Sequence, residues 1–189
     1  MKKRCAWVGD HPLMREYHDT EWGVPLHHDH RLFEFLILEG FQAGLSWSTI
    51  LRKREAFQGA FDDFDPDKIA QYDRRKMEEL ACDEGIVRNH LKIRATIQNA
   101  QCLLRVREEY NSFDSYIWQF VDHIPLINAF KKIEEIPSYT AMSLAMSTDL
   151  KKRGFKFVGP TICYSFMQAV GMVNDHTVDC FRYEQVQIR

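Results

Sequence analysis

The sequence of 189 residues contains no apolar run that approaches the roughly 20 residues needed for a membrane-spanning helix. Its opening segment, MKKRCAWVGD, lacks the apolar core of a secretory signal peptide. These two absences argue against a membrane protein and against a secreted one. We therefore expect a cytoplasmic protein with no membrane partner.

Segments with the two-residue alternation of a β-strand are also missing, as are internal repeats and low-complexity linkers. Helical patterns fill almost the whole chain instead. The run HRLFEFLILEG, which follows Asp29, has too many apolar positions for a surface helix and is expected at the centre of the fold. Capping residues and first-turn prolines predict helix boundaries at Ser46, Asp65-Pro66, Gly154 and Gly159-Pro160. We expect one all-α domain that spans residues 1–189.

The five cysteines are an odd number at scattered positions, so they do not form a recognisable disulfide framework. Two of them have a histidine within reach: Cys5 lies thirteen residues before His18, and His176 lies four residues before Cys180. On a helical turn the last pair shares one face. Together the four side chains would complete a tetrahedral zinc site of the structural type. The alternative is that the cysteines are buried thiols and the histidines ordinary polar residues.

The net charge of −2 argues weakly against a nucleic-acid partner, but the charges are segregated. Residues 86–107 and 151–174 contain nine Lys and Arg residues and no Asp or Glu. The second stretch includes Lys152 and Lys156. If the two stretches lie together, they would attract a polyanion such as DNA to one face. The alternative is a pair of solvated helix faces.

A helix-hairpin-helix layout is indicated at residues 77–106, which include ACDEGIVRNHLKIRATI. Gly85 is expected to end a short helix in the left-handed conformation, and a basic helix with Arg88 and Lys92 at its start follows. Backbone N–H groups of such a turn bind a phosphate without reading sequence. Two helices joined by a glycine turn also occur in any helical bundle, so this alternative stays open.

Glu39 is a carboxylate inside the apolar run LEGFQAGLSW, where burial is costly unless the group is hydrogen-bonded or serves a ligand. The same half of the chain contains Trp7, Tyr17, Trp22 and Trp47. Aromatic walls around one carboxylate suit a flat, electron-poor ring that carries an amine. The alternative is that the tryptophans are core residues and that Glu39 pairs with a basic neighbour.

Several long motifs in order along the chain give it a resemblance to a known family: RCAWV, YHDTEWGVP, LEGFQAGLSW, GIVRNHLKI, KKRGFKFVGPTICYSFMQAVGMVNDH and a final His-x-x-x-Cys. On these motifs the chain resembles the bacterial 3-methyladenine DNA glycosylase I family of the helix-hairpin-helix superfamily. The resemblance implies the helix-hairpin-helix glycosylase fold, with the termini tied by one structural Zn²⁺ on Cys5, His18, His176 and Cys180. It further implies a monomer that acts on alkylated double-stranded DNA.

The resemblance also implies roles in the removal of 3-methyladenine. Glu39 would recognise the base and is the one carboxylate expected near the chemistry, and Trp7, Tyr17, Trp22 and Trp47 would form the walls. Leu45, after Gly44, would be an apolar wedge for the space that a flipped base leaves. Residues 86–107 lack the aspartate that superfamily members generally carry after the hairpin. Nothing marks Lys92 as a Schiff-base lysine, so we expect a monofunctional enzyme with no lyase activity.

One position departs from the family pattern, because Phe41 stands where a polar residue, usually glutamine, is expected. If that loop borders the lesion, its contacts with the duplex would differ. Two other readings of the chain compete with a glycosylase: a zinc-tied DNA-binding module without activity, and a metallohydrolase in which water replaces one zinc ligand. An aromatic pocket around Glu39 argues against the first, and a full set of four ligands argues against the second.

Overall fold

The computed structural model describes residues 2–187, so residues 1, 188 and 189 of the expected domain lie outside the described part. Helices dominate this part of the chain, and no helix in it is both long and apolar enough to cross a membrane. The α-helices in chain order are α1 (Pro12–Thr20), α2 (Asp29–Gln42), α3 (Trp47–Ala60), α4 (Pro66–Ile69), α5 (Arg74–Cys82), α6 (His90–Tyr110), α7 (Phe113–Trp118), α8 (Ala141–Lys152), α9 (Pro160–Ala169) and α10 (Arg182–Gln185). Short 3₁₀ helices are η1 (Ala6–Val8), η2 (Asp62–Phe64), η3 (Gln119–Val121) and η4 (Ile133–Glu135).

A very small sheet is the feature that the sequence did not indicate. Strands β1 (Leu126–Ile127) and β2 (Val173–Asn174) pair in parallel. Two residues are too few for an alternating pattern to be visible in a sequence. The prediction of a helical fold is otherwise confirmed.

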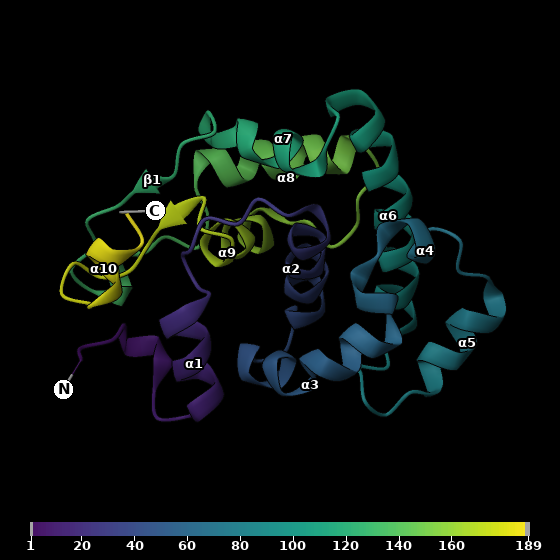
Figure 1. Cartoon of the computed structure of the whole chain (residues 1–189), viewed down its shortest axis with the longest axis horizontal. Coiled ribbons are helices and arrows are strands. Elements are labelled where there is room, and N and C mark those ends of the chain that lie inside the picture. Colours follow the sequence, from purple (N-terminus) through teal and green to yellow (C-terminus); the bar gives the residue numbers. More distant parts are fainter. Residues whose placement is uncertain (1, 188–189) are drawn as a thin grey trace.

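Helix α2 lies at the centre of the molecule, with α3, α6, α7 and α9 packed around it (Figure 1). Every residue of α2 from Leu32 to Phe41 is buried. An apolar surface on all sides of a helix requires such a central position. The prediction from the apolar run is therefore confirmed, and Glu39 is carried into the interior with it.

Local capping explains the helix boundaries next to the site. The side-chain oxygen of Ser46 accepts a hydrogen bond of 3.2 Å from the backbone N–H of Thr49, which begins α3 as predicted. At the end of α8, Gly154 has φ of +99°, and the next N–H, that of Phe155, donates to the carbonyl of Leu150 at 3.0 Å. This helix end fixes the start of the loop that carries Lys156.

The prediction for Gly85 is wrong. Helix α5 ends at Cys82, and Gly85 is not among the residues with positive φ. Glycine is needed there for a different reason: a Cβ atom on Gly85 would lie 3.0 Å from the Cβ atom of Ala56 on α3. The residue therefore permits close packing of two backbones and does not cap a helix.

The prediction that His176 and Cys180 share a helical turn is also wrong. They lie in the loop between β2 and α10, where the N–H of Cys180 donates to the carbonyl of Thr177 at 2.8 Å. The N-terminal segment runs beside this loop, since the N–H of Phe181 donates to the carbonyl of Lys3 at 3.0 Å. The two ends of the chain accordingly lie on the same side of the molecule (Figure 1).

Candidate active site and metal centre

A cavity of about 290 Å³ opens beside Glu39. This volume is close to the lower limit of about 300 Å³ for small-molecule pockets. The cavity is lined by all five residues that the sequence suggested for a base pocket and by six others: Trp7, Met14, Tyr17, Trp22, Glu39, Gln42, Trp47, Ile133, Ile136, Ser165 and Gln168. Residues that are far apart in the sequence thus meet at one site.

The aromatic walls come from four short segments around the central helix. Trp7 belongs to η1 and Tyr17 to α1, Trp22 follows α1, and Trp47 is the first residue of α3. The ring centroids of Trp7 and Trp22 lie 4.9 Å apart, and those of Tyr17 and Trp47 lie 5.4 Å apart. These distances are typical of packed aromatic pairs, so the walls support one another.

Glu39 lies in the last turn of α2 and is 4% exposed. No described residue donates a hydrogen bond to its carboxyl group, and burial alone raises its pKa to about 8. The free protein therefore holds a proton on Glu39 at neutral pH. A buried carboxyl group without a partner, at the edge of a cavity, is available to a ligand.

Glu34, five residues earlier on the same helix, is a buried carboxylate with a structural role. It is 2% exposed and forms ion pairs with Arg54 at 2.7 Å and Arg31 at 2.9 Å. Glu39 has no such arginine among the described residues. The contrast indicates that Glu39 is not held in place as a structural ion.

Tyr17 lies against the same carboxyl group. Burial raises its pKa well above the ordinary value, and the charge of Glu39 raises it further. The phenol consequently stays protonated in the range in which Glu39 titrates. It adds a neutral hydrogen-bonding group to an otherwise aromatic wall.

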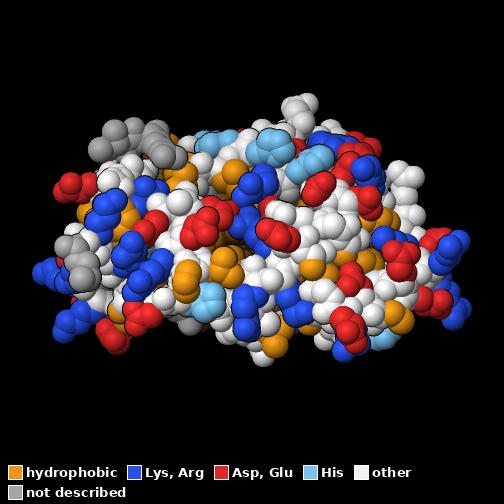
Figure 2. All heavy atoms as spheres, turned by 60° about the horizontal axis from the view of Figure 1, so that its bottom comes forward, with side chains coloured by type: hydrophobic (Ala, Val, Ile, Leu, Met, Phe, Trp, Pro, Cys, Tyr) orange, Lys and Arg blue, Asp and Glu red, His pale blue; other side chains and the backbone are white. Residues whose placement is uncertain are grey.

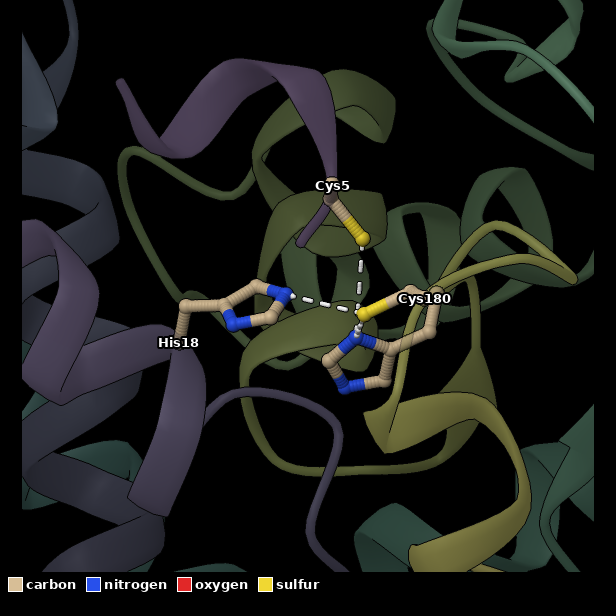
Figure 3. A group of neighbouring side chains, drawn as sticks. Cys5, His18 and Cys180 are labelled. Carbon is tan, nitrogen blue, oxygen red and sulfur yellow. Dashed lines mark hydrogen bonds between the residues drawn. The ribbon is translucent and has the colours of Figure 1, made fainter. Parts of the chain in front are cut away.

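Four buried side chains form the candidate metal centre: Cys5, His18, His176 and Cys180. The sulfur of Cys180 lies 3.4 Å from Nε2 of His18 and 3.6 Å from Nδ1 of His176. Nδ1 of His176 is 3.5 Å from the sulfur of Cys5. Figure 3 shows Cys5, His18 and Cys180 pointing toward a common centre. In a tetrahedral zinc site the usual bond lengths separate sulfur and nitrogen ligands by about 3.5 Å, so these residues fit zinc.

The second nitrogen of each histidine ring is also bound. Nδ1 of His18 lies 2.8 Å from the carboxylate of Asp19, which in turn accepts hydrogen bonds from Arg4. Nε2 of His176 lies 3.0 Å from the backbone carbonyl of Trp22. Such contacts place the ring protons away from the sulfurs and leave the inner nitrogens free to ligate. Because Trp22 also lines the cavity, the metal centre and the pocket share a wall.

The neighbouring ligands make the thiol of Cys180 more acidic. Its hydrogen bond with Cys5, and then those with the two histidines, hold the pKa of Cys180 below its ordinary value. The backbone N–H of Arg182 also points at this sulfur, at 3.5 Å. The site therefore stabilises a thiolate at Cys180, which is the ligand form of cysteine.

Four of the residues predicted to contact DNA lie in two turns. Gly44, with φ of +82°, and Leu45, which is 42% exposed, lie in residues 43–46 between α2 and α3, here named the wedge turn. Gly85 and Arg88 lie in residues 83–89 between α5 and α6, here named the hairpin turn. Arg88 is exposed and reaches Glu84 at 3.5 Å.

The two basic stretches, residues 86–107 and 151–174, lie next to each other. Asn99 of α6 bonds both the N–H and the carbonyl of Lys156, at 2.7 and 3.0 Å. Acidic residues from elsewhere neutralise part of the charge, because Arg107 pairs with Asp67 and Arg153 with Glu109. On the face in Figure 2 the basic and acidic side chains are interspersed. Lys152 and Lys156 are exposed and have no ion pair within residues 2–187.

Lys92 does not lie where a phosphate contact would place it. It is 7% exposed, and its ammonium donates to the backbone carbonyls of Phe41 at 2.8 Å and Ala43 at 2.7 Å. Since two of its three donors are used inside the protein, the sequence-based role as a surface cation is not supported by its position.

The sequence model of the methyladenine glycosylase family matches residues 7–183. The chain belongs to this family. DNA-3-methyladenine glycosylase 1 of Escherichia coli is 50% identical over 181 residues, which cover 96% of this chain and 97% of that protein. A crystal structure of 3-methyladenine DNA glycosylase I has a TM-score of 0.93 at 49% identity, over 95% of this chain and 98% of that one. A variant in complex with 3-methyladenine has a TM-score of 0.92 at 36% identity, over 94% and 96%.

Within this methyladenine glycosylase fold, the position of Phe41 argues against an effect of this residue on contacts with the duplex. The side chain is 1% exposed and packs on Phe57, with ring centroids 4.8 Å apart. It therefore lies in the core and not at the border of a lesion. The next residue, Gln42, lines the cavity.

Six of the residues that line the cavity were not predicted from the sequence. Most of them lie three positions from another lining residue on the same helix, as Gln42 does from Glu39 and Met14 from Tyr17. Helical periodicity could have identified these two. Ser165 and Gln168 are polar residues three apart on the apolar helix α9, which was a usable signal. Ile133 and Ile136 carry no comparable signal.

Proposed function

We propose that this chain is a DNA glycosylase that releases 3-methyladenine from alkylated double-stranded DNA. The observation that supports this most strongly is Glu39, which is buried, has no hydrogen-bond partner among the described residues and lines an aromatic cavity. The relatives named above carry this activity in their names, and one of them was solved with the base bound.

In this proposal the charge of the damaged base drives recognition. Adenine methylated at ring nitrogen 3 is cationic while it is attached to the sugar, so its glycosidic bond is already weak. The ring would stack between Trp47 and the other walls, and Glu39 would accept a hydrogen bond from the exocyclic amine. A cation beside Glu39 favours the ionised carboxylate, so binding would displace its proton. Normal adenine, which is neutral, gains less from this site.

The reaction requires little further catalysis. Water would attack the anomeric carbon of the sugar as the glycosidic bond breaks; the electron pair of that bond would neutralise the departing base, and the proton of the water would pass to solvent. The enzyme would be monofunctional. Residues 86–107 contain no carboxylate, and Lys92 is bound to backbone carbonyls, so neither a second acid nor a Schiff-base lysine is assigned. Base extrusion costs a few kcal/mol and is least costly for a damaged base.

Contacts with DNA are assigned to exposed groups at the surface. Leu45 would fill the space left by the extruded nucleotide. The N–H groups of a helix-hairpin-helix motif, with Gly85 and Arg88, would hold a phosphate, and Lys152 and Lys156 would add charge. We further propose that the chain acts as a monomer and as one domain.

Zinc is assigned a structural role. Cys5, His18, His176 and Cys180 would hold it and leave no open position for an activated water. Its contribution would be to join the two ends of the chain and to fix Trp22 and Trp7 near the cavity. No step of the reaction is assigned to it.

The test is release of free purine from N-methylated duplex DNA in EDTA-containing buffer, followed by chromatography. We expect 3-methyladenine to be released by the wild type, and release to be strongly reduced in Glu39→Gln. Folded wild-type protein that binds the duplex but releases no base would instead indicate a DNA-binding module. Loss of release on chelation, with the fold intact, would indicate metal catalysis.

A further inference from the structure

Two lysines connect the wedge turn and the hairpin turn. Each turn is followed by a helix, α3 after the wedge turn and α6 after the hairpin turn. Lys53 lies on α3 and Lys92 lies on α6. Neither lysine forms an ion pair with a carboxylate in the part of the chain that the structure describes. Their ammonium groups bind backbone carbonyls instead.

Lys92 binds the end of α2. Its ammonium donates to the carbonyls of Phe41 and Ala43, at 2.8 and 2.7 Å. The last carbonyls of a helix lack partners within the helix and carry partial negative charge, so a cation is favourable there. Lys92 is 7% exposed, and this burial lowers the pKa of its ammonium. The helix after the hairpin turn thus holds the segment that leads into Leu45.

Lys53, on the helix after the wedge turn, binds the hairpin turn. Its ammonium donates to the carbonyl of Glu84 at 2.9 Å and to that of Gly85 at 3.0 Å. The helix after the wedge turn thus holds the hairpin turn. Close packing of Gly85 against Ala56, one turn further along α3, brings the two backbones together at the same place.

We propose that Lys53 and Lys92 form a reciprocal clamp that fixes the wedge turn relative to the hairpin turn. Both are positioning residues, and neither touches the base or the reacting atoms. The clamp would keep Leu45 at a set distance from the phosphate that the hairpin turn binds, so that docking of the backbone places the wedge at the damaged step. This inference rests on the proposed function.

An exposed lysine that binds phosphate is the competing role, and the contacts argue against it. Lys92 is 7% exposed and Lys53 is half-buried, and each ammonium already makes two charge-assisted hydrogen bonds to carbonyls. Moving Lys92 to a phosphate would leave the carbonyl of the buried Phe41 unpaired, and moving Lys53 would do the same to the carbonyl of the half-buried Gly85.

The test replaces each lysine by methionine, which keeps the unbranched chain and removes the donors. Single-turnover release from methylated duplex should fall about ten- to hundredfold in Lys92→Met, because two charge-assisted hydrogen bonds that hold the wedge turn are lost. Affinity for free 3-methyladenine, measured by tryptophan fluorescence, should stay within about twofold, since the free base enters the cavity without base extrusion. Lys53→Met should behave in the same way.

The salt dependence of duplex binding separates the clamp from a phosphate contact. We expect the slope of log affinity against log salt to equal that of the wild type in both variants. Lys68→Met, which removes an exposed lysine on α4, is the matched control for loss of one charge. Lys92→Arg keeps the charge and should recover part of the rate.

Three results would overturn the clamp. Unchanged duplex release in both methionine variants is the first. In the second, the slope of log affinity against log salt falls by about one in each variant, which would assign a phosphate contact to each lysine. Equal losses of duplex release and free-base affinity would assign a general structural role. If the wild type released no base while it still bound 3-methyladenine and duplex, the proposed function would fail, and the salt slopes would still decide the position of the lysines.

Discussion

The buried, unpartnered state of Glu39 makes a prediction about stability that can be tested without any substrate. The folded chain keeps the carboxyl proton up to a pKa of about 8, whereas the unfolded chain loses it above the ordinary value of 4.5. Between these two pH values the folded state binds more protons than the unfolded state. The free energy of unfolding should therefore fall as pH rises through this window, and it should be unaffected by Glu39 below it.

The size of the effect follows from the shift. Each pH unit in the window costs about 1.4 kcal/mol, so the accumulated loss is about 3 kcal/mol at neutral pH. Glutamine has the shape of the protonated acid and does not titrate. Glu39→Gln should match the wild type near pH 5, where little of the loss has accumulated, and should be more stable at neutral pH by about 3 kcal/mol, or roughly 10 °C in Tm.

The assay is thermal unfolding followed by circular dichroism at a series of pH values from about 5 to 8, a range set by the window above. Glu34→Gln is the matched control, because it is equally buried on the same helix but is paired with Arg54. It should lower Tm throughout this range, since it leaves a buried arginine without its carboxylate. A Glu39→Gln protein that is less stable than the wild type at neutral pH, or a difference that does not grow with pH, would refute the reasoning.

Three further experiments test separate parts of the site. Cys180→Ser should lose stoichiometric zinc, measured by atomic absorption, and should lower Tm. The control Cys82→Ser, at an exposed thiol, should change neither the zinc content nor Tm. Full zinc content with unchanged Tm in Cys180→Ser would exclude the metal centre. Trp47→Ala should weaken binding of free 3-methyladenine about ten- to hundredfold in a fluorescence titration, and equal affinity would remove this wall from the pocket. Lys152→Ala combined with Lys156→Ala should reduce the salt slope of duplex binding by about two, and an identical slope would place both lysines outside the interface.

Much of the fold followed from local chemistry. The central position of α2 follows from its apolar surface on every side, and the start of α3 follows from the cap at Ser46. Sequence patterns failed where the outcome depended on contacts between distant segments. Gly85 is required by Ala56 on another helix, and no local pattern reveals such a contact.

The candidate site shows the same division. Residue type singled out Glu39 and the tryptophans, because a carboxylate in an apolar run and clustered indoles are visible in the sequence. The position of Lys92 was not predictable, since its binding to carbonyls of α2 depends on how α6 crosses that helix. His176 and Cys180 were paired correctly in space, although the turn that brings them together is not helical.

The claim on which the function depends is that Glu39 and its aromatic walls hold a methylated adenine. Calorimetric titration of the wild type and of Glu39→Gln with free 3-methyladenine and with adenine tests it most directly. We predict one site per wild-type chain that prefers 3-methyladenine, and a loss of that preference in the variant. Equal binding of the two bases by the wild type, or an unchanged preference in Glu39→Gln, would contradict the claim.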